Sequence, residues 1–250
     1  HLMQNIDFGG PFRSGMAGIF ANYSADLDGT VSGRGVNAWV EMPFRDGGSI
    51  NPGISWIGSG FDRWEGPEGT WYPQALSGSF EAGTSWYAPV RVSAGVEGGE
   101  FVQEGTFESY DADLTLRPGT AASIDLEAGL YRTFNARCYN WEAEAWDTRN
   151  TEWRNLVGRL NWMFGPDASM RVFSQYSRFE TDFDITGAQP GEEVTFNALY
   201  SLEYRPGSML YLLGELISER QGSGAWGRTV PGFFVKMTWF EAFQGSPQIS

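Results

Sequence analysis

The feature that most constrains the fold of this chain is a regular alternation of apolar and polar residues over long segments. Apolar side chains occupy nearly every second position between residues 194 and 205, and similar alternation recurs at residues 90–97, 111–117, 123–130 and 155–164. Successive residues of a β-strand point to opposite faces of the sheet, so a period of two indicates strands. The pattern predicts a sheet with one apolar face and one polar face.

The predicted strands are longer than those of ordinary soluble sheets. Soluble strands centre on about 5–6 residues, whereas a tilted strand that crosses a bilayer needs about 9–11. The excess length favours an all-β fold, an antiparallel up-and-down transmembrane β-barrel of about 12 strands. The twelve predicted strands are residues 15–26, 34–43, 50–60, 74–87, 89–102, 107–117, 122–134, 153–165, 168–181, 193–205, 209–220 and 231–240.

The predicted connections alternate between short and long. Two short ones, at residues 117–120 and 205–208, carry Pro before Gly, which suits the second and third positions of a type II turn. Short turns on one side and long loops on the other are typical of outer-membrane barrels, whose short turns are periplasmic. We therefore expect short periplasmic turns and longer extracellular loops, the longest at residues 135–152. The expected domains are a periplasmic N-terminal segment (1–14), the transmembrane β-barrel (15–240) and a C-terminal tail (241–250).

Aromatic residues make up 16% of the chain and gather near the ends of predicted strands, as at Trp86–Tyr87 and Trp162–Phe164. A belt of Trp and Tyr at the lipid headgroups accounts for this placement. The core of a soluble sandwich also uses aromatic residues, so this pattern alone leaves both folds open. No window of 18 apolar residues occurs, which excludes a transmembrane helix.

The second half of the chain, from Asp111 to Phe240, resembles a group of bacterial outer-membrane proteins. Members of this family carry an amino-terminal carbohydrate-binding-like domain followed by a carboxy-terminal β-barrel of unassigned function. The resemblance implies a barrel in the bacterial outer membrane, and it implies no activity. The segments that carry it are LTLRPGTAASIDLEAGLYR, LVGRLNWMFGPDASMRVFSQYSRFE, FNALYSLEYRPGSMLYLLGE and FFVKMTW.

This chain departs from the family in two respects. It shows no carbohydrate-binding-like domain, so a glycan role inferred from that domain is not carried over. The family ends on a terminal aromatic residue, whereas here ten residues follow Phe240.

Enzymatic chemistry has few candidate residues. His1 is the only histidine, so hydrolytic mechanisms that need an imidazole base have none in a predicted strand. Cys138 has no histidine partner, and we place it in a loop. We expect that the protein is not an enzyme, and that it has no catalytic residue, no cofactor and no metal site.

Paired carboxylates leave one enzymatic alternative. Asp111 with Asp113, and Asp125 with Glu127, are predicted to lie on one face of neighbouring strands. Glycoside hydrolysis uses two carboxylates about 5–10 Å apart, which such a hairpin can supply. In the simpler interpretation they neutralise arginines on the same face, namely Arg91, Arg117 and Arg159.

The net charge of −14 argues against binding to nucleic acid. The expected partners are outer-membrane lipid, lipopolysaccharide and an envelope protein complex. The expected function is a passive small-solute channel or a membrane-embedded scaffold subunit of that complex. The alternative is a soluble or surface glycan-binding β-domain that uses Trp64, Trp71 and Trp146. The predicted pore-lining residues are Arg91, Glu97, Asp111, Asp113, Arg117, Asp125, Glu127, Arg159, Glu203, Arg205, Glu215 and Lys236.

Overall fold

A computed structural model describes residues 2–27, 29–140, 143–182, 190–221, 226–227 and 229–238. In these residues no helix is long and apolar enough to span a membrane. The strands are β1 (Leu2–Asp7), β2 (Ser14–Ala25), β3 (Val31–Pro43), β4 (Ser49–Ile57), β5 (Gly60–Asp62), β6 (Thr70–Tyr72), β7 (Ala75–Gly83), β8 (Val90–Glu100), β9 (Thr106–Leu116), β10 (Ala122–Asn140), β11 (Ala145–Met163), β12 (Ala168–Thr181), β13 (Gly191–Arg205), β14 (Ser208–Gln221) and β15 (Val230–Met237).

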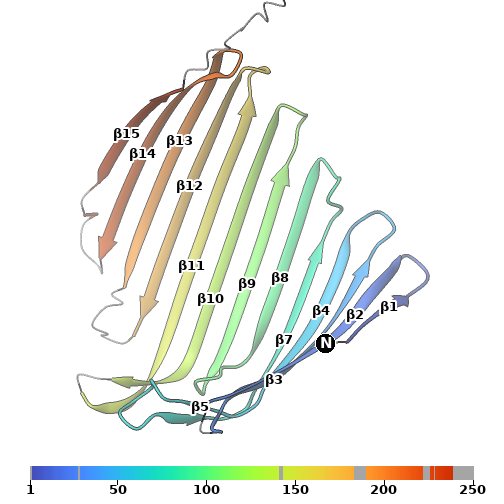
Figure 1. The fold of residues 1–250 in the computed structure, drawn as a ribbon, viewed down its shortest axis with the longest axis vertical. Coiled ribbons are helices and arrows are strands. Elements are labelled where there is room, and N and C mark those ends of the chain that lie inside the picture. Colours follow the sequence, from blue (N-terminus) through green and yellow to red (C-terminus); the bar gives the residue numbers. More distant parts are fainter. Residues whose placement is uncertain are drawn as a thin grey trace, which may run out of the picture.

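Thirteen of these strands form one sheet in which each strand pairs with the next along the chain. Every pairing is antiparallel, and Figure 1 shows the strands side by side in a single curved layer. The short strands β5 and β6 form a separate hairpin between β4 and β7. The all-β, antiparallel, up-and-down prediction is therefore confirmed.

The edges of the sheet are β1 and β15. No pairing between these two strands occurs within the described residues, so closure of the sheet into a barrel stays a prediction. Each of the twelve predicted strands has a counterpart in the sheet, and β1 is an additional one, which makes thirteen strands rather than twelve. β1 pairs with β2 from Leu2 opposite Ile19 to Asp7 opposite Ser14. Its six residues alternate too briefly to be recognised in the sequence.

The expected long loop at residues 135–152 is wrong. β10 and β11 each contain 19 residues, and their pairing continues to Asn140 opposite Ala145. A bulge between Thr133 and Ala136, where Asn135 has a φ of 53°, separates this extension from the rest of the hairpin. Each face of the extension mixes polar and apolar side chains, so the extension lacks the alternation that marks the other strands. Cys138 accordingly lies in a buried strand segment rather than in a loop.

Little of the sheet is buried. The buried apolar side chains of the described residues are Tyr72, Ala75, Ala136, Cys138 and Val157, and no second layer covers either face. On one face, large apolar side chains are exposed from β1 to β15, including Leu2 (76%), Leu156 (53%) and Phe233 (75%). We call this the apolar face and the opposite one the polar face. Monomeric soluble proteins rarely expose apolar patches larger than a few hundred Å².

Candidate functional site

The polar face carries the predicted pore-lining residues. Directly opposed residues of an antiparallel pair point to the same face, and so do residues two apart in one strand. One row therefore crosses the sheet from Arg91 through Thr115, Asp125, Arg159, Phe173, Asn197 and Glu215. The same rule places Glu97, Asp111, Asp113, Glu127, Glu203 and Lys236 on this face. Arg117 lies in the turn after β9, and Arg205 ends β13 beyond a register shift.

The charges of the polar face are balanced less completely than expected. Glu127 forms an ion pair with Arg159, as predicted. The other two expected counter-charges make different contacts: Arg91 lies over the Trp86 ring at 3.1 Å, and Arg117 donates to the Trp86 carbonyl oxygen at 3.1 Å. The carboxylates they were expected to neutralise instead accept from hydroxyl groups. Thr115 donates to Asp125 at 2.8 Å, and Ser93 donates to Asp113 at 3.2 Å.

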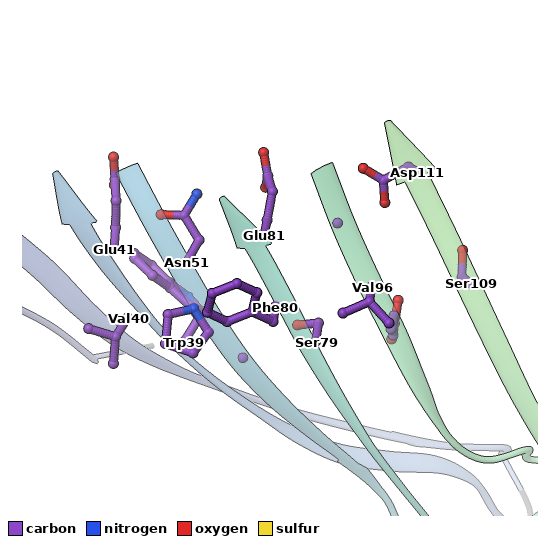
Figure 2. Close-up of a pocket in the computed structure, with 14 residues that line it drawn as sticks. Trp39, Val40, Glu41, Asn51, Ser79, Phe80, Glu81, Val96, Ser109 and Asp111 are labelled. Atoms are coloured by element: carbon purple, nitrogen blue, oxygen red, sulfur yellow. The ribbon is translucent and has the colours of Figure 1, made fainter. Parts of the chain in front are cut away.

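An acidic groove of about 390 Å³ lies on the N-terminal half of the polar face, across β3, β4, β7, β8 and β9. Figure 2 shows Glu41, Asn51 and Glu81 projecting to one side of the sheet. Glu81 is opposite Gly95, which in turn is opposite Asp111, so these acids share one row. Among the described residues, Glu81, Glu97 and Asp111 have no cationic partner. The groove is therefore a region of negative potential.

The polar face becomes partly apolar towards the C-terminal edge, which the sequence analysis missed. Leu199, Leu213 and Phe234 are opposed in register and lie on the polar face. In the sequence, Leu199 and Leu213 each directly adjoin an apolar residue of the other face, which breaks the alternation. That break was the available signal, and it shows that apolar side chains interrupt the charged lining at this edge.

The apolar face ends, towards the longer connections, at a belt of ion pairs that crosses six strands from β9 to β14. Arg132 bridges Glu108 at 3.1 Å and Glu152 at 2.7 Å. Glu192 in turn forms an ion pair with Arg178 at 3.6 Å and accepts a hydrogen bond from Arg220 at 2.5 Å. We define the ion-pair belt as Glu108, Arg132, Glu152, Arg154, Arg178, Glu180, Glu192 and Arg220.

The belt residues lie on the apolar face, because they are in register with its apolar side chains. Arg132 and Ala128 are both on that face of β10, as are Glu192 and Ala198 on β13. Below the belt, each of these strands presents only apolar or small side chains, apart from hydroxyl groups, for about 10 residues, the length that a tilted membrane-crossing strand requires. The belt therefore forms a sharp polar boundary to an apolar band of nearly constant height.

A compact cap lies at the end of the sheet opposite the short turns. We define the cap as residues 58–74, 101–105, 134–140 and 143–152. In Figure 1, β5 and the extension of β10 and β11 lie together at the lower end of the sheet. Glu65 accepts from the Tyr139 backbone N–H at 3.0 Å, a contact that joins the β5–β6 hairpin to the β10 extension. The cap thus reaches past the ends of β7, β8 and β9.

The interior of the cap contains three of the five buried apolar side chains of the described residues, Tyr72, Ala136 and Cys138. Ala136 is 1% exposed and Cys138 is 6% exposed. Arg137 holds the turn at 101–105 in two ways, since its N–H donates to the Gln103 carbonyl at 2.7 Å and its guanidinium pairs with Glu104 at 2.9 Å. The same guanidinium lies 4.1 Å from the Trp146 ring. The cap is therefore a packed unit in which three connections of the chain meet.

Cys138 provides a direct measure of cap packing. Burial raises the pKa of its thiol above the usual value, so less thiolate is present at neutral pH. We expect maleimide labelling of the folded protein at pH 7.5 to be at least about tenfold slower than labelling of the guanidinium-unfolded protein. Equal rates in the two states, followed by mass spectrometry, would show that the cap does not form in solution.

Comparison with known proteins adds little to these observations. No protein-family model and no curated protein sequence match the chain. One solved structure, described as a NanC porin in a rhombohedral crystal form, aligns with a TM-score of 0.33 at 11% sequence identity. The alignment covers 90% of this chain and 98% of that chain. A score at this level does not establish a shared fold.

Proposed function

We propose that this chain is a bacterial outer-membrane β-barrel protein that acts as a passive channel for small solutes. The apolar band that ends at the ion-pair belt carries the proposal. A membrane barrel needs an outward apolar band about 25 Å tall. About ten residues per strand, tilted as barrel strands are, span that height. The belt then marks the level at which the strands leave the hydrocarbon core.

Lipid exposure also explains why the apolar face has no covering layer. Ionised side chains are costly at the centre of a bilayer, and the belt places them at its edge. Unpaired backbone groups are equally costly in lipid, so the edges β1 and β15 have to be covered when the sheet is in a membrane. In the proposal the sheet closes into a barrel, with the apolar face against lipid and lipopolysaccharide and the polar face inside.

The polar face supplies the path for solutes. Glu81, Glu97 and Asp111 line it without cationic partners in the part of the chain that the structure describes, so it favours cations over anions. The cap narrows the end at which the longer connections lie. In this proposal the chain binds no cofactor and carries out no catalysis, and a partner in an envelope complex would contact the parts outside the lipid.

Conductance in planar bilayers tests the proposal. We expect discrete steps with a preference for K⁺ over Cl⁻ in a salt gradient, because the free carboxylates concentrate cations in the path. The triple variant Glu81→Gln, Glu97→Gln, Asp111→Asn should lower that preference, while the control Glu144→Gln, in the exposed β10–β11 turn, should leave it unchanged. Absence of steps over a range of salt concentrations would reject the channel and leave the scaffold subunit.

A further inference from the structure

The cap contains a cavity that the proposed channel does not use. Its volume is about 350 Å³, which lies within the range of small-molecule pockets. The β5–β6 hairpin supplies much of its wall, and the rest comes from the turn at 101–105, the loop end of β3, the end of β4 and Asp26. The side chains that matter for the argument are Asp26, Phe61, Arg63, Trp64, Tyr72 and Gln103.

Tyr72 is an unusual residue for such a wall. Its side chain is 7% exposed, and its hydroxyl oxygen makes no hydrogen bond of standard geometry with the described residues. Burial, together with the nearby carboxylates of Glu65 and Asp62 and against a lowering contact with the Gln103 side chain, raises the pKa of Tyr72 to about 12, so the hydroxyl stays protonated. The contact of this hydroxyl with the Gln103 side chain falls short of standard hydrogen-bond geometry. A buried hydroxyl that is poorly satisfied costs free energy, which a ligand hydroxyl can recover.

The other lining groups favour a neutral polyhydroxylated ligand. Trp64 is 88% exposed and lies at the cavity, where its ring can cover the C–H face of a sugar. Phe61, supported by Trp71 at 5.5 Å, adds a second aromatic surface. Gln103 contributes an amide that can both donate and accept. Aromatic faces beside a few polar groups are the usual composition of a small-molecule pocket.

The charges at the cavity do not suit an anion. Asp26 is paired with Arg63 at 2.7 Å, so the one cation among the described wall residues is already neutralised. Asp62 accepts from the Trp64 backbone N–H at 2.8 Å and adds a negative charge. A phosphate or carboxylate would therefore meet a net negative wall, whereas a sugar hydroxyl would find acceptors.

We propose that the cavity of the cap binds a neutral carbohydrate, with Trp64 against the sugar ring and Tyr72 donating to, or accepting from, a sugar hydroxyl. This site goes beyond the proposed channel function and depends only on the cap being folded. A sugar held there would lie at the mouth of the lumen.

Tryptophan fluorescence of the full chain, in a detergent without a sugar headgroup, tests the site. The probes are maltotriose, cellotriose and chitotriose, with inorganic phosphate as the anionic comparison. We expect saturable quenching by at least one trisaccharide and none by phosphate. Calorimetry measures the affinity of each variant, so that loss of the Trp64 signal is not mistaken for loss of binding.

Three variants locate the binding. Tyr72→Phe keeps the ring and removes the hydroxyl, and we expect it to weaken binding about tenfold. Trp64→Ala, at an exposed position, should abolish binding without unfolding the cap. Tyr204→Phe removes a hydroxyl at the other end of the sheet and should change nothing.

The site is overturned if no trisaccharide binds, if Tyr72→Phe binds as tightly as the native chain, or if phosphate competes with the sugar. Slow labelling of Cys138 confirms in each variant that the cap is folded. If no sugar binds but the conductance is as expected, the sugar site is rejected and the channel is kept. If a sugar binds but no conductance steps occur, the channel alone is rejected.

Discussion

The substitution Ala198→Arg should destabilise the bilayer-embedded protein by about 2–4 kcal/mol, which is the cost of an arginine side chain at the midplane of a membrane barrel. Ala198 lies on the apolar face, halfway between the ion-pair belt and the turn after β13, and it is opposite Val172 and Gly214. A side chain on Gly214 would meet no atom within 4 Å, so the site is open rather than crowded. The expected cost is therefore one of solvation and not of steric overlap.

Two neighbouring substitutions separate lipid exposure from other effects. Ala198→Leu adds volume without charge and should be tolerated. Asn197→Arg places the same charge one residue away on the polar face, where the Asn197 amide lies 3.1 Å from a carboxylate oxygen of Glu215, and should cost little. Urea unfolding in lipid vesicles, followed by the mobility of unheated samples in gels, measures the stability of the variants Ala198→Arg, Ala198→Leu and Asn197→Arg. Equal stability of the two arginine variants would mean that neither face contacts lipid.

The fold of the main sheet could be predicted because its strands carry their own signal. Each strand that crosses the apolar band must alternate, so the period of two marks strands such as β13 and β14 to within a few residues. The polar lining followed for the same reason, since Asp113, Asp125 and Glu127 occupy the positions between apolar residues. The strand of the main sheet that the sequence did not predict was β1, whose six residues are too few to show a period of two.

The ion-pair belt and the cap could not be predicted in the same way. The belt residues have the parity of the apolar face, so alternation alone assigns them to no structure, and only the register brings Arg132 between Glu108 and Glu152. The cap depends on contacts between segments far apart in the chain, such as Glu65 with Tyr139. Cys138 was placed in a loop because each face of the β10 extension mixes polar and apolar side chains. No local sequence pattern predicts tertiary packing of this kind.

The cap should open when Gly105 is replaced by alanine. Gly105 has a φ of +82°, a left-handed conformation that costs an L-residue about 1–2 kcal/mol. A Cβ at this position would also lie against the carbonyl oxygen of Phe134 and 2.7 Å from that of Asn135. These are backbone atoms of the β10 bulge, so they cannot turn away as a flexible side chain could. The turn at 101–105 must therefore move off β10.

This displacement should appear at Cys138 and not in the main sheet. Separation of the turn from β10 breaks the contacts of Arg137 with Gln103 and Glu104 and admits water to the thiol. We expect maleimide labelling of Gly105→Ala to approach the rate of the unfolded chain, while its β-sheet circular dichroism stays native. Gly119→Ala is the matched control, because Gly119 has open space around it and lies in a short turn at the other end. Slow labelling of Gly105→Ala would show that the turn at 101–105 does not hold the cap closed, and labelling of Gly119→Ala at the same fast rate would show that the effect is not local to the cap.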